Sequence, residues 1–458
     1  MNKLESIAAL REKEDYYLGI KTLNRKLVAL KLAVQDNSIL TMPRFISFQN
    51  TCFCNLRCPH CWSHGTGELR KNHNSIVMDD NMLFELGKET LPFADSFSLT
   101  RNGEPLATPH LDKILAELSK YGAKLDLLTN GTLLTSAQLP MLIVNAKTIE
   151  ISIDGATQHT FETIRLGAKF KKVIQNIRLL SNTIRLLPED LRPTLEFAWT
   201  IMGSNISELP EIVKLSSALG VQKINAHFII IVNNDKIKHE SVEYHKHAYN
   251  YYHQKATKVA RDLNVTIRLP PPFKEFSNNI DRPEDREHMI VKQFPKDYYE
   301  TMVSPESLIN LIDHNAMQRE ATEVRDIVIR MASRRCQDFH SSCLIYNLQE
   351  MQEYFEGLLN KHSAVIQEII TKAEETIQYC HITHRNMYVS PLGDITPCCL
   401  FWHVVGNVKD ENVKNIWNGE AYEEFRRKVH GKHPFEQCVN CPEMTYVKKG
   451  RLIEEIFE

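Results

Sequence analysis

The feature that most constrains the fold is a strand–helix alternation that starts at residue 45 and ends near residue 232. Short apolar runs, such as residues 45–51 and 96–100, alternate with segments of helical periodicity, such as 78–91 and 157–187. Six such units predict a parallel sheet with right-handed crossovers, curled or closed, with ligands bound at the carboxyl ends of its strands.

The flanking regions read as mostly helical. Helices are expected over residues 1–40 and 239–262, and the clearest helix after residue 274 is expected to run from about 347 to 377. We predict an N-terminal helical extension (1–40), a strand–helix domain (41–273), a helical insertion (274–378) and a C-terminal module (379–458).

Composition decides how the cysteines are interpreted. The formal net charge of −2 gives no electrostatic footprint for nucleic acid, and no apolar run is long enough to span a membrane. The charged N-terminus lacks an apolar signal core, so we expect a cytoplasmic protein. A reducing compartment disfavours disulfides, so clustered cysteines there are more often metal ligands. Of eleven cysteines, four lie between residues 52 and 61 and five between 380 and 441, which predicts two metal sites.

The first cluster is CNLRCPHC, in which Cys54, Cys58 and Cys61 follow the first predicted strand. Three thiolates in this spacing leave one ligand position open, as catalytic metal sites do. Two alternatives use Cys52 as a fourth ligand, either for structural zinc or for a cluster bound by four cysteines. His60, between two of the cysteines, is expected to pack or to support a ligand.

A C-x3-C-x2-C loop after the first strand of a six-unit domain resembles the radical S-adenosylmethionine (SAM) superfamily. The resemblance implies a partial (β/α)6 TIM-like barrel and a [4Fe–4S] cluster on Cys54, Cys58 and Cys61. It also implies that the amine and carboxylate of SAM chelate the remaining iron. A one-electron reduction would then cleave SAM to methionine and a 5′-deoxyadenosyl radical, which removes a hydrogen atom from substrate.

Two further segments carry the resemblance. TRNGEPL, after the second strand, is similar to the family's Gly-Gly-Glu-Pro motif, with Asn102 in place of the first glycine. This likeness implies that Asn102, Gly103 and Glu104 contact the methionine moiety of SAM. ISIDGATQHTFETIRLGAKF resembles the SPASM-type subgroup, which implies ribose contacts from Ser152 and Asp154 and a carboxylate contact from Arg165.

The last eighty or so residues look like a shortened SPASM module. The resemblance implies one auxiliary [4Fe–4S] cluster on Cys380, Cys398, Cys438 and Cys441, and hence two clusters in the chain. Cys399 competes with Cys398 for the second ligand position. Zinc remains an alternative here, because it also accepts a closed set of four cysteines.

The function implied is radical SAM chemistry on a peptide or a small natural product, with a flavodoxin or ferredoxin as reductant. One alternative is the same chemistry on a sugar or nucleotide-sugar. Another is a non-catalytic iron–sulfur protein that transfers electrons or acts as a scaffold. Cys336 and Cys343 lie in the insertion, where a thiol could donate a hydrogen atom, although buried, inert cysteines are the commoner case.

Overall fold

The structure is a computed structural model of the chain. It describes residues 3–61, 63–65, 76–100, 102–231, 234–274, 313–335, 347–398, 403–431, 434–439, 441 and 444–457.

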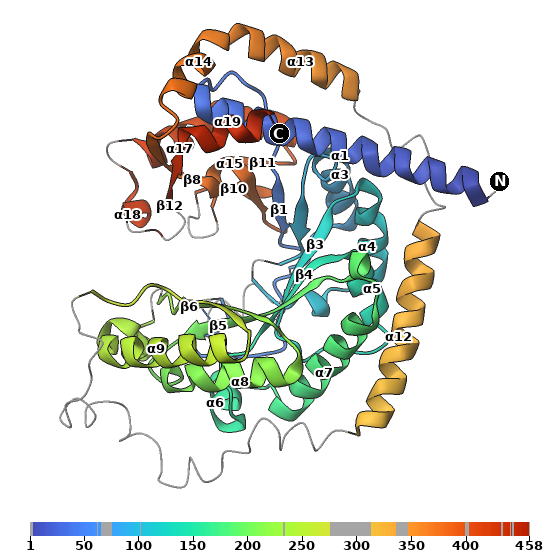
Figure 1. Ribbon diagram of the computed structural model, residues 1–458, viewed down its shortest axis with the longest axis vertical. Coiled ribbons are helices and arrows are strands. Elements are labelled where there is room, and N and C mark those ends of the chain that lie inside the picture. Colours follow the sequence, from blue (N-terminus) through green and yellow to red (C-terminus); the bar gives the residue numbers. More distant parts are fainter. Residues whose placement is uncertain are drawn as a thin grey trace.

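The centre of the molecule is one ten-stranded sheet of order β11-β10-β9-β1-β2-β3-β4-β5-β6-β7, in which the strands from β9 to β7 run parallel. Its first seven strands in chain order are β1 (Phe45–Phe48), β2 (Ser96–Ser98), β3 (Lys124–Thr129), β4 (Ala146–Ser152), β5 (Thr194–Ile201), β6 (Lys223–Phe228) and β7 (Thr266–Arg268). The described strands form a linear order with two ends rather than a closed ring. The predicted parallel sheet is therefore confirmed, as an open, partial barrel (Figure 1).

Helices between these strands cover the outer face of the sheet (Figure 1). They are α3 (Asp80–Thr90), α4 (Leu111–Leu118), α5 (Leu139–Asn145), α6 (Gln158–Ile164), α7 (Phe170–Leu186), α8 (Leu209–Leu219) and α9 (Lys246–Asp262). Their apolar sides and the sheet form one continuous core, with Phe161, Phe170 and Trp199 fully buried. The single helix predicted over 157–187 is wrong. The turn between α6 and α7 contains Gly167 at φ +100°, a left-handed conformation that a helix cannot contain.

The remaining helices pack around this domain. The N-terminal helix α1 (Lys3–Val34) lies against α13 (Leu348–Lys361), α14 (Ser363–Thr371) and α19 (Lys449–Phe457). Helix α12 (His314–Arg335) lies along α5 and α7 (Figure 1). The helix predicted from 347 to 377 is also wrong in extent, because it breaks at His362 and the chain becomes strand β8 at Thr376. No helix in the described part of the chain is both long and apolar enough to cross a bilayer.

The C-terminal region joins the central sheet directly. Its elements are β8 (Thr376–Cys380), α15 (His381–Arg385), β9 (Asn386–Val389), β10 (Asp394–Thr396), β11 (Gly406–Asn407), α16 (Val413–Asn418), α17 (Glu420–His430), α18 (Glu436–Val439) and β12 (Met444–Lys448). Strand β9 pairs with β1 in register from Phe45 opposite Asn386 to Phe48 opposite Val389. Strands β8 and β12 form a separate antiparallel pair. The chain therefore returns to the strand that precedes the first cysteine loop.

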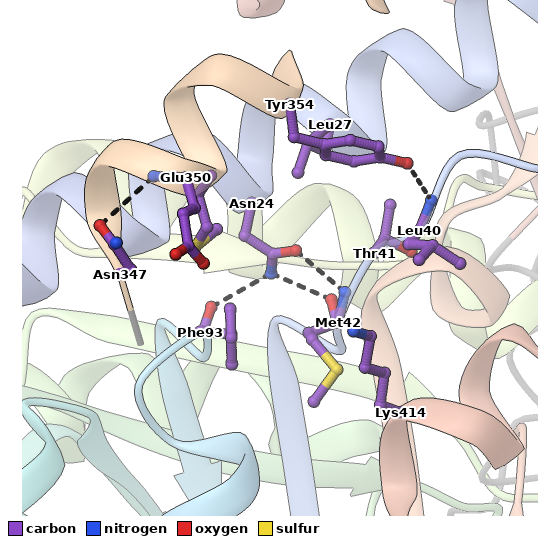
Figure 2. Close-up of a pocket in the computed structure, with 11 residues that line it drawn as sticks. Asn24, Leu27, Leu40, Thr41, Met42, Phe93, Asn347, Glu350, Tyr354 and Lys414 are labelled. Carbon is purple, nitrogen blue, oxygen red and sulfur yellow. Dashed lines mark hydrogen bonds between the residues drawn. The ribbon is translucent and has the colours of Figure 1, made fainter. Parts of the chain in front are cut away.

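A pocket of about 330 Å³ lies at the amino ends of the strands (Figure 2). It is lined by α1, by the segment before β1, and by residues of α13 and α16, including Asn24, Met42, Phe93 and Tyr354. Met42 and Phe93 come just before β1 and β2 in the chain. Because these strands are parallel, the pocket lies at the opposite end of the sheet from the cysteine loop, which follows β1.

Candidate functional site

The first cysteine loop begins where β1 ends and is folded tightly by backbone contacts. The Cys61 N–H donates to the Cys58 carbonyl at 3.0 Å, and the Gly65 N–H donates to the Cys61 carbonyl at 2.7 Å. A Cβ on Gly65 would lie 2.5 Å from the Pro59 carbonyl oxygen, so only glycine permits this approach. The turn brings Cys54, Cys58 and Cys61 close enough for each thiol to influence the pKa of its neighbours.

The three thiols have different electrostatic surroundings. Burial raises the pKa of Cys54 to about 11 and that of Cys58 to about 12. Burial alone would also raise the pKa of Cys61, but hydrogen bonding, with the His64 ring first, outweighs burial and lowers it. The Cys54 sulfur accepts from the Leu56 N–H at 3.5 Å. The Arg165 guanidinium adds positive charge beside Cys54 and Cys58.

Cys52 lies in the same loop but its side chain has another partner. The Gln49 amide donates to the Cys52 sulfur at 2.9 Å, and the Asn102 amide donates to Gln49 at 3.3 Å. The Cys52 carbonyl is 2.9 Å from His64 Nε2, and the other ring nitrogen of His64 is 3.7 Å from the Cys61 sulfur. His64 therefore bridges the two cysteine segments, a role that our sequence analysis missed because no motif marks it.

The Asn102–Glu104 segment lies directly over this loop. Gly103 adopts φ +123°, and a Cβ there would lie 2.7 Å from the Thr51 carbonyl oxygen and 2.8 Å from that of Phe53. The Glu104 N–H donates to the Phe53 carbonyl at 2.7 Å. Only a glycine in a left-handed conformation lets the two segments approach this closely.

The Glu104 carboxylate is 1% exposed and is held by three donors. They are the Leu106 N–H (3.1 Å), the Thr129 hydroxyl (2.6 Å) and the Asn130 N–H (2.8 Å). Burial raises the pKa of Glu104, although these hydrogen bonds oppose the rise. The Asn130 amide also donates to Asn55 at 2.9 Å and to the Cys54 sulfur at 3.9 Å. Asn130 thus links Glu104 to the cysteine loop, a role that our sequence analysis did not assign to it.

Arg165 and Asp154 form a buried ion pair at the end of β4. Arg165 Nη2 lies 2.6 Å from Asp154 Oδ2, and His60 Nε2 lies 3.5 Å from the same oxygen. Asp154 Oδ1 accepts from the Thr200 N–H at 2.8 Å. Burial would raise the pKa of Asp154, but the Arg165 charge outweighs it and the pKa is lowered. The carboxylate is fully buried, whereas Ser152, two residues earlier, is 9% exposed.

The second cysteine group lies around the β8–β12 pair. Cys380 ends β8 opposite Met444, whose N–H donates to the Cys441 carbonyl at 3.1 Å. The Cys441 N–H in turn donates to the Cys438 carbonyl at 3.3 Å. Burial raises the pKa of Cys380 to about 11, and the neighbouring Cys438 and Cys441 add to the rise. Cys398 packs in the same apolar cluster as Cys380, so the structure brings the four predicted ligands into one region.

Other predicted residues cannot be placed. Cys336, Cys343 and Cys399 lie outside the described residues. Across the described ranges, no three histidine, cysteine, aspartate or glutamate side chains are arranged as ligands of a single metal ion.

Family models match the chain in two places. Residues 50–216 match the radical SAM superfamily, and residues 380–442 match the SPASM iron–sulfur cluster-binding domain.

Individual relatives match shorter stretches. The AdoMet-dependent heme synthase of Methanosarcina barkeri is 27% identical over 195 residues, which cover 41% of this chain and 51% of the relative. The antilisterial bacteriocin subtilosin biosynthesis protein AlbA of Bacillus subtilis is 28% identical, over 37% of this chain and 39% of its own length. The chain thus spans about half, or less, of the length of these curated relatives.

The fold is also similar to that of solved structures. Streptococcus suis SuiB bound to S-adenosylmethionine aligns with a TM-score of 0.52 at 12% identity, over 90% of this chain and 73% of SuiB. At this identity the likeness concerns the fold alone. The two family models lead to one conclusion: the chain belongs to the radical SAM superfamily and carries a SPASM iron–sulfur cluster-binding domain.

Proposed function

We propose that this protein is a radical SAM enzyme that acts on a peptide or a small natural product. The observation that carries the proposal is the close approach of the Glu104 segment to the three-cysteine loop at the carboxyl end of the sheet, with the charge of Arg165 beside Cys54 and Cys58. Ligands of such folds bind at that end. The family match and the SAM-bound neighbour of the same fold support the assignment.

The donor set fits a [4Fe–4S] cluster on Cys54, Cys58 and Cys61. Burial raises the pKa of the Cys54 and Cys58 thiols, and a bound metal centre would add to the positive charge of Arg165 that lowers it. The Cys52 sulfur is held by Gln49, which favours three cysteine ligands over four. When bound, the cluster supplies the electron that cleaves SAM to methionine and a 5′-deoxyadenosyl radical.

The surrounding residues would bind and orient SAM. Glu104 has three donors on its two oxygens, and a carboxylate has about four acceptor positions, so it can accept one more bond, from the SAM ammonium group. Arg165 lies beside the thiols and offers a guanidinium to the SAM carboxylate. Ser152, the last residue of β4, would contact the ribose. Asp154 is fully buried against Arg165, so we propose that it acts by orienting that guanidinium.

Cys380, Cys398, Cys438 and Cys441 would hold an auxiliary [4Fe–4S] cluster. Their shared region and the SPASM match support this set, with Cys399 as the alternative to Cys398.

Asn102 and Gly103 would bring the backbone to the methionine moiety of SAM. A flavodoxin- or ferredoxin-type reductant is expected, because the first cluster must be reduced.

The names of the relatives suggest the substrate class. SuiB also has a structure bound to its precursor peptide SuiA, and AlbA is named for bacteriocin biosynthesis, which favours a peptide. The heme synthase relative supports the alternative of a small-molecule substrate.

The test replaces Cys54, Cys58 and Cys61 with alanine and measures 5′-deoxyadenosine after anaerobic reconstitution with iron, sulfide and dithionite. We expect the triple variant to lose one cluster's iron and all SAM cleavage. Cys52→Ala is the matched control, because the Cys52 sulfur accepts a hydrogen bond from Gln49. This variant should cleave SAM at the wild-type rate. Continued 5′-deoxyadenosine production by the triple variant would refute the proposal, and loss of iron in Cys52→Ala would favour four cysteine ligands.

A further inference from the structure

His430, the last residue of α17, connects the auxiliary cysteines to the rest of the molecule. Its Nε2 is 3.0 Å from the backbone nitrogen of Cys380, and its Nδ1 is 2.7 Å from the Arg426 carbonyl oxygen. A backbone N–H can only donate and a carbonyl can only accept. The ring is therefore the neutral tautomer with its proton on Nδ1, accepting from Cys380 and donating to Arg426. Both ring nitrogens are occupied, so neither is offered to a metal.

The bond to Cys380 restrains more than one cysteine. Cys380 is 5% exposed and is the last residue of β8, where it pairs in register with Met444. The Met444 N–H holds the carbonyl of Cys441, and the Cys441 N–H holds that of Cys438. A shift of Cys380 would therefore move β12 and the turn that carries two further thiols.

Beyond Arg426 the contacts reach the N-terminal helix. The Arg426 guanidinium donates to the carbonyls of Thr383 (3.0 Å) and Trp417 (2.8 Å) and to the carboxylate of Glu423 (2.5 Å). Lys31 of α1 donates to the same carboxylate at 2.6 Å. Both cationic side chains and the carboxylate are at most 6% exposed. Buried groups in this arrangement have few alternative partners, so Arg426 gives His430 a rigid support.

We propose that His430 is a positioning residue for the auxiliary iron–sulfur site, holding the Cys380 backbone so that its thiol faces the other ligands. The inference rests on the proposed function in one respect, namely that Cys380 is a ligand. Removing a residue that orients a metal ligand typically lowers metal affinity by about 10- to 100-fold. The contribution of His430 should fall in that range and should be confined to the auxiliary site.

The test uses two substitutions of similar size. His430→Leu removes both hydrogen bonds, whereas His430→Gln can accept from Cys380 through its carbonyl and donate through its amide. Both are placed in the full chain carrying Cys54→Ala, Cys58→Ala and Cys61→Ala, where only the auxiliary site is expected to bind iron. Iron and sulfide are counted after anaerobic reconstitution, and the rate of iron loss to a ferrous chelator is measured. Circular dichroism checks that each variant is folded.

We expect His430→Leu to lower iron affinity by about 10- to 100-fold and His430→Gln to restore most of it. The inference is overturned if folded His430→Leu keeps its iron as the background protein does. It is also overturned if His430→Gln loses iron as readily as His430→Leu. A background protein that binds no iron at all refutes the auxiliary ligand set itself, and the role of His430 with it. Iron contents of the background protein and of the two His430 variants thus distinguish a wrong ligand set from a wrong role for His430.

Discussion

At the scale of single residues, the site contains buried charged groups that stabilise the fold only when they are paired. Arg165 and Asp154 are the clearest case, since their side chains are 11% and 0% exposed and lie 2.6 Å apart. Breaking a buried ion pair by removing one partner leaves an uncompensated charge and is strongly destabilising. Removing one partner should therefore lower the free energy of unfolding even when SAM and iron are absent.

We predict that Asp154→Asn lowers the free energy of unfolding by about 3–5 kcal/mol. Urea denaturation of the cluster-free protein, followed by circular dichroism, measures the change. The control is Lys214→Ala, which removes an exposed pair with Glu211 and should cost at most about 1 kcal/mol. If Asp154→Asn lowers the free energy of unfolding as little as the control does, the Asp154 carboxylate does not stabilise the fold through Arg165. The ribose contact first predicted for Asp154 would then be favoured.

The residues that meet at the candidate site were predictable only where a motif marked them. Cys54, Cys58, Cys61 and Glu104 stood in recognisable spacings, and the structure brings all of them together. The contacts of His64 with Cys61 and of Asn130 with Cys54 were missed, because a sequence pattern does not tell which way these side chains point. Asp154 was noticed, but its burial depends on Thr200 and Arg165, which lie on other elements.

At the scale of elements, the approach of two loops depends on one glycine. Gly103 has φ +123°, which costs an L-residue about 1–2 kcal/mol or more before any contact is considered. A Cβ there would also meet two backbone oxygens at 2.7 and 2.8 Å, and backbone atoms cannot move aside as a flexible side chain can.

We predict that Gly103→Ala separates the Glu104 segment from the cysteine loop and weakens SAM binding at least tenfold, since a charge-assisted bond contributes about 1.5–3 kcal/mol. Equilibrium dialysis with SAM on the reconstituted protein measures the affinity. Gly357→Ala is the matched control, because this glycine lies within α13 with nothing within 4 Å of the added carbon. That change should leave SAM binding intact and stabilise the helix by about 0.5–1 kcal/mol. Equal affinities in the two variants would contradict the prediction.

Element positions followed from the sequence where the signal was local. The strands β1 to β6 were visible as short apolar runs, and their parallel arrangement follows from the helices between them. The break at His362 was not visible, because the apolar series of α13 and α14 continues across it. The pairing of β9 with β1 joins residues more than 300 positions apart, so only the folded chain reveals it.

At the scale of the whole molecule, this pairing makes the C-terminal region part of the central sheet. β9 bonds to β1 along four residue pairs, and Met387 and Val389 of β9 are buried in the main core. Three of the proposed auxiliary ligands lie at a separate two-stranded sheet: Cys380 ends β8, and Cys438 and Cys441 come just before β12. The fourth, Cys398, follows β10 of the central sheet. Loss of the auxiliary metal should therefore disturb mainly β8 and β12, because the backbone pairing of β9 with β1 holds β1 and the cysteine loop that follows it in place.

The last prediction tests this division. The intact chain should hold about eight iron atoms, four from each of two [4Fe–4S] clusters. Cys438→Ala with Cys441→Ala removes two of the four proposed auxiliary ligands, and should leave about four irons. Because β9 stays bonded to β1, the double variant should still form 5′-deoxyadenosine with dithionite, at a rate within a few-fold of the parent's. Iron analysis and product quantification on the same folded sample provide the measurement. Four irons with one zinc in the parent chain would contradict the auxiliary assignment. Loss of 5′-deoxyadenosine in the double variant would instead show that SAM cleavage depends on the auxiliary site.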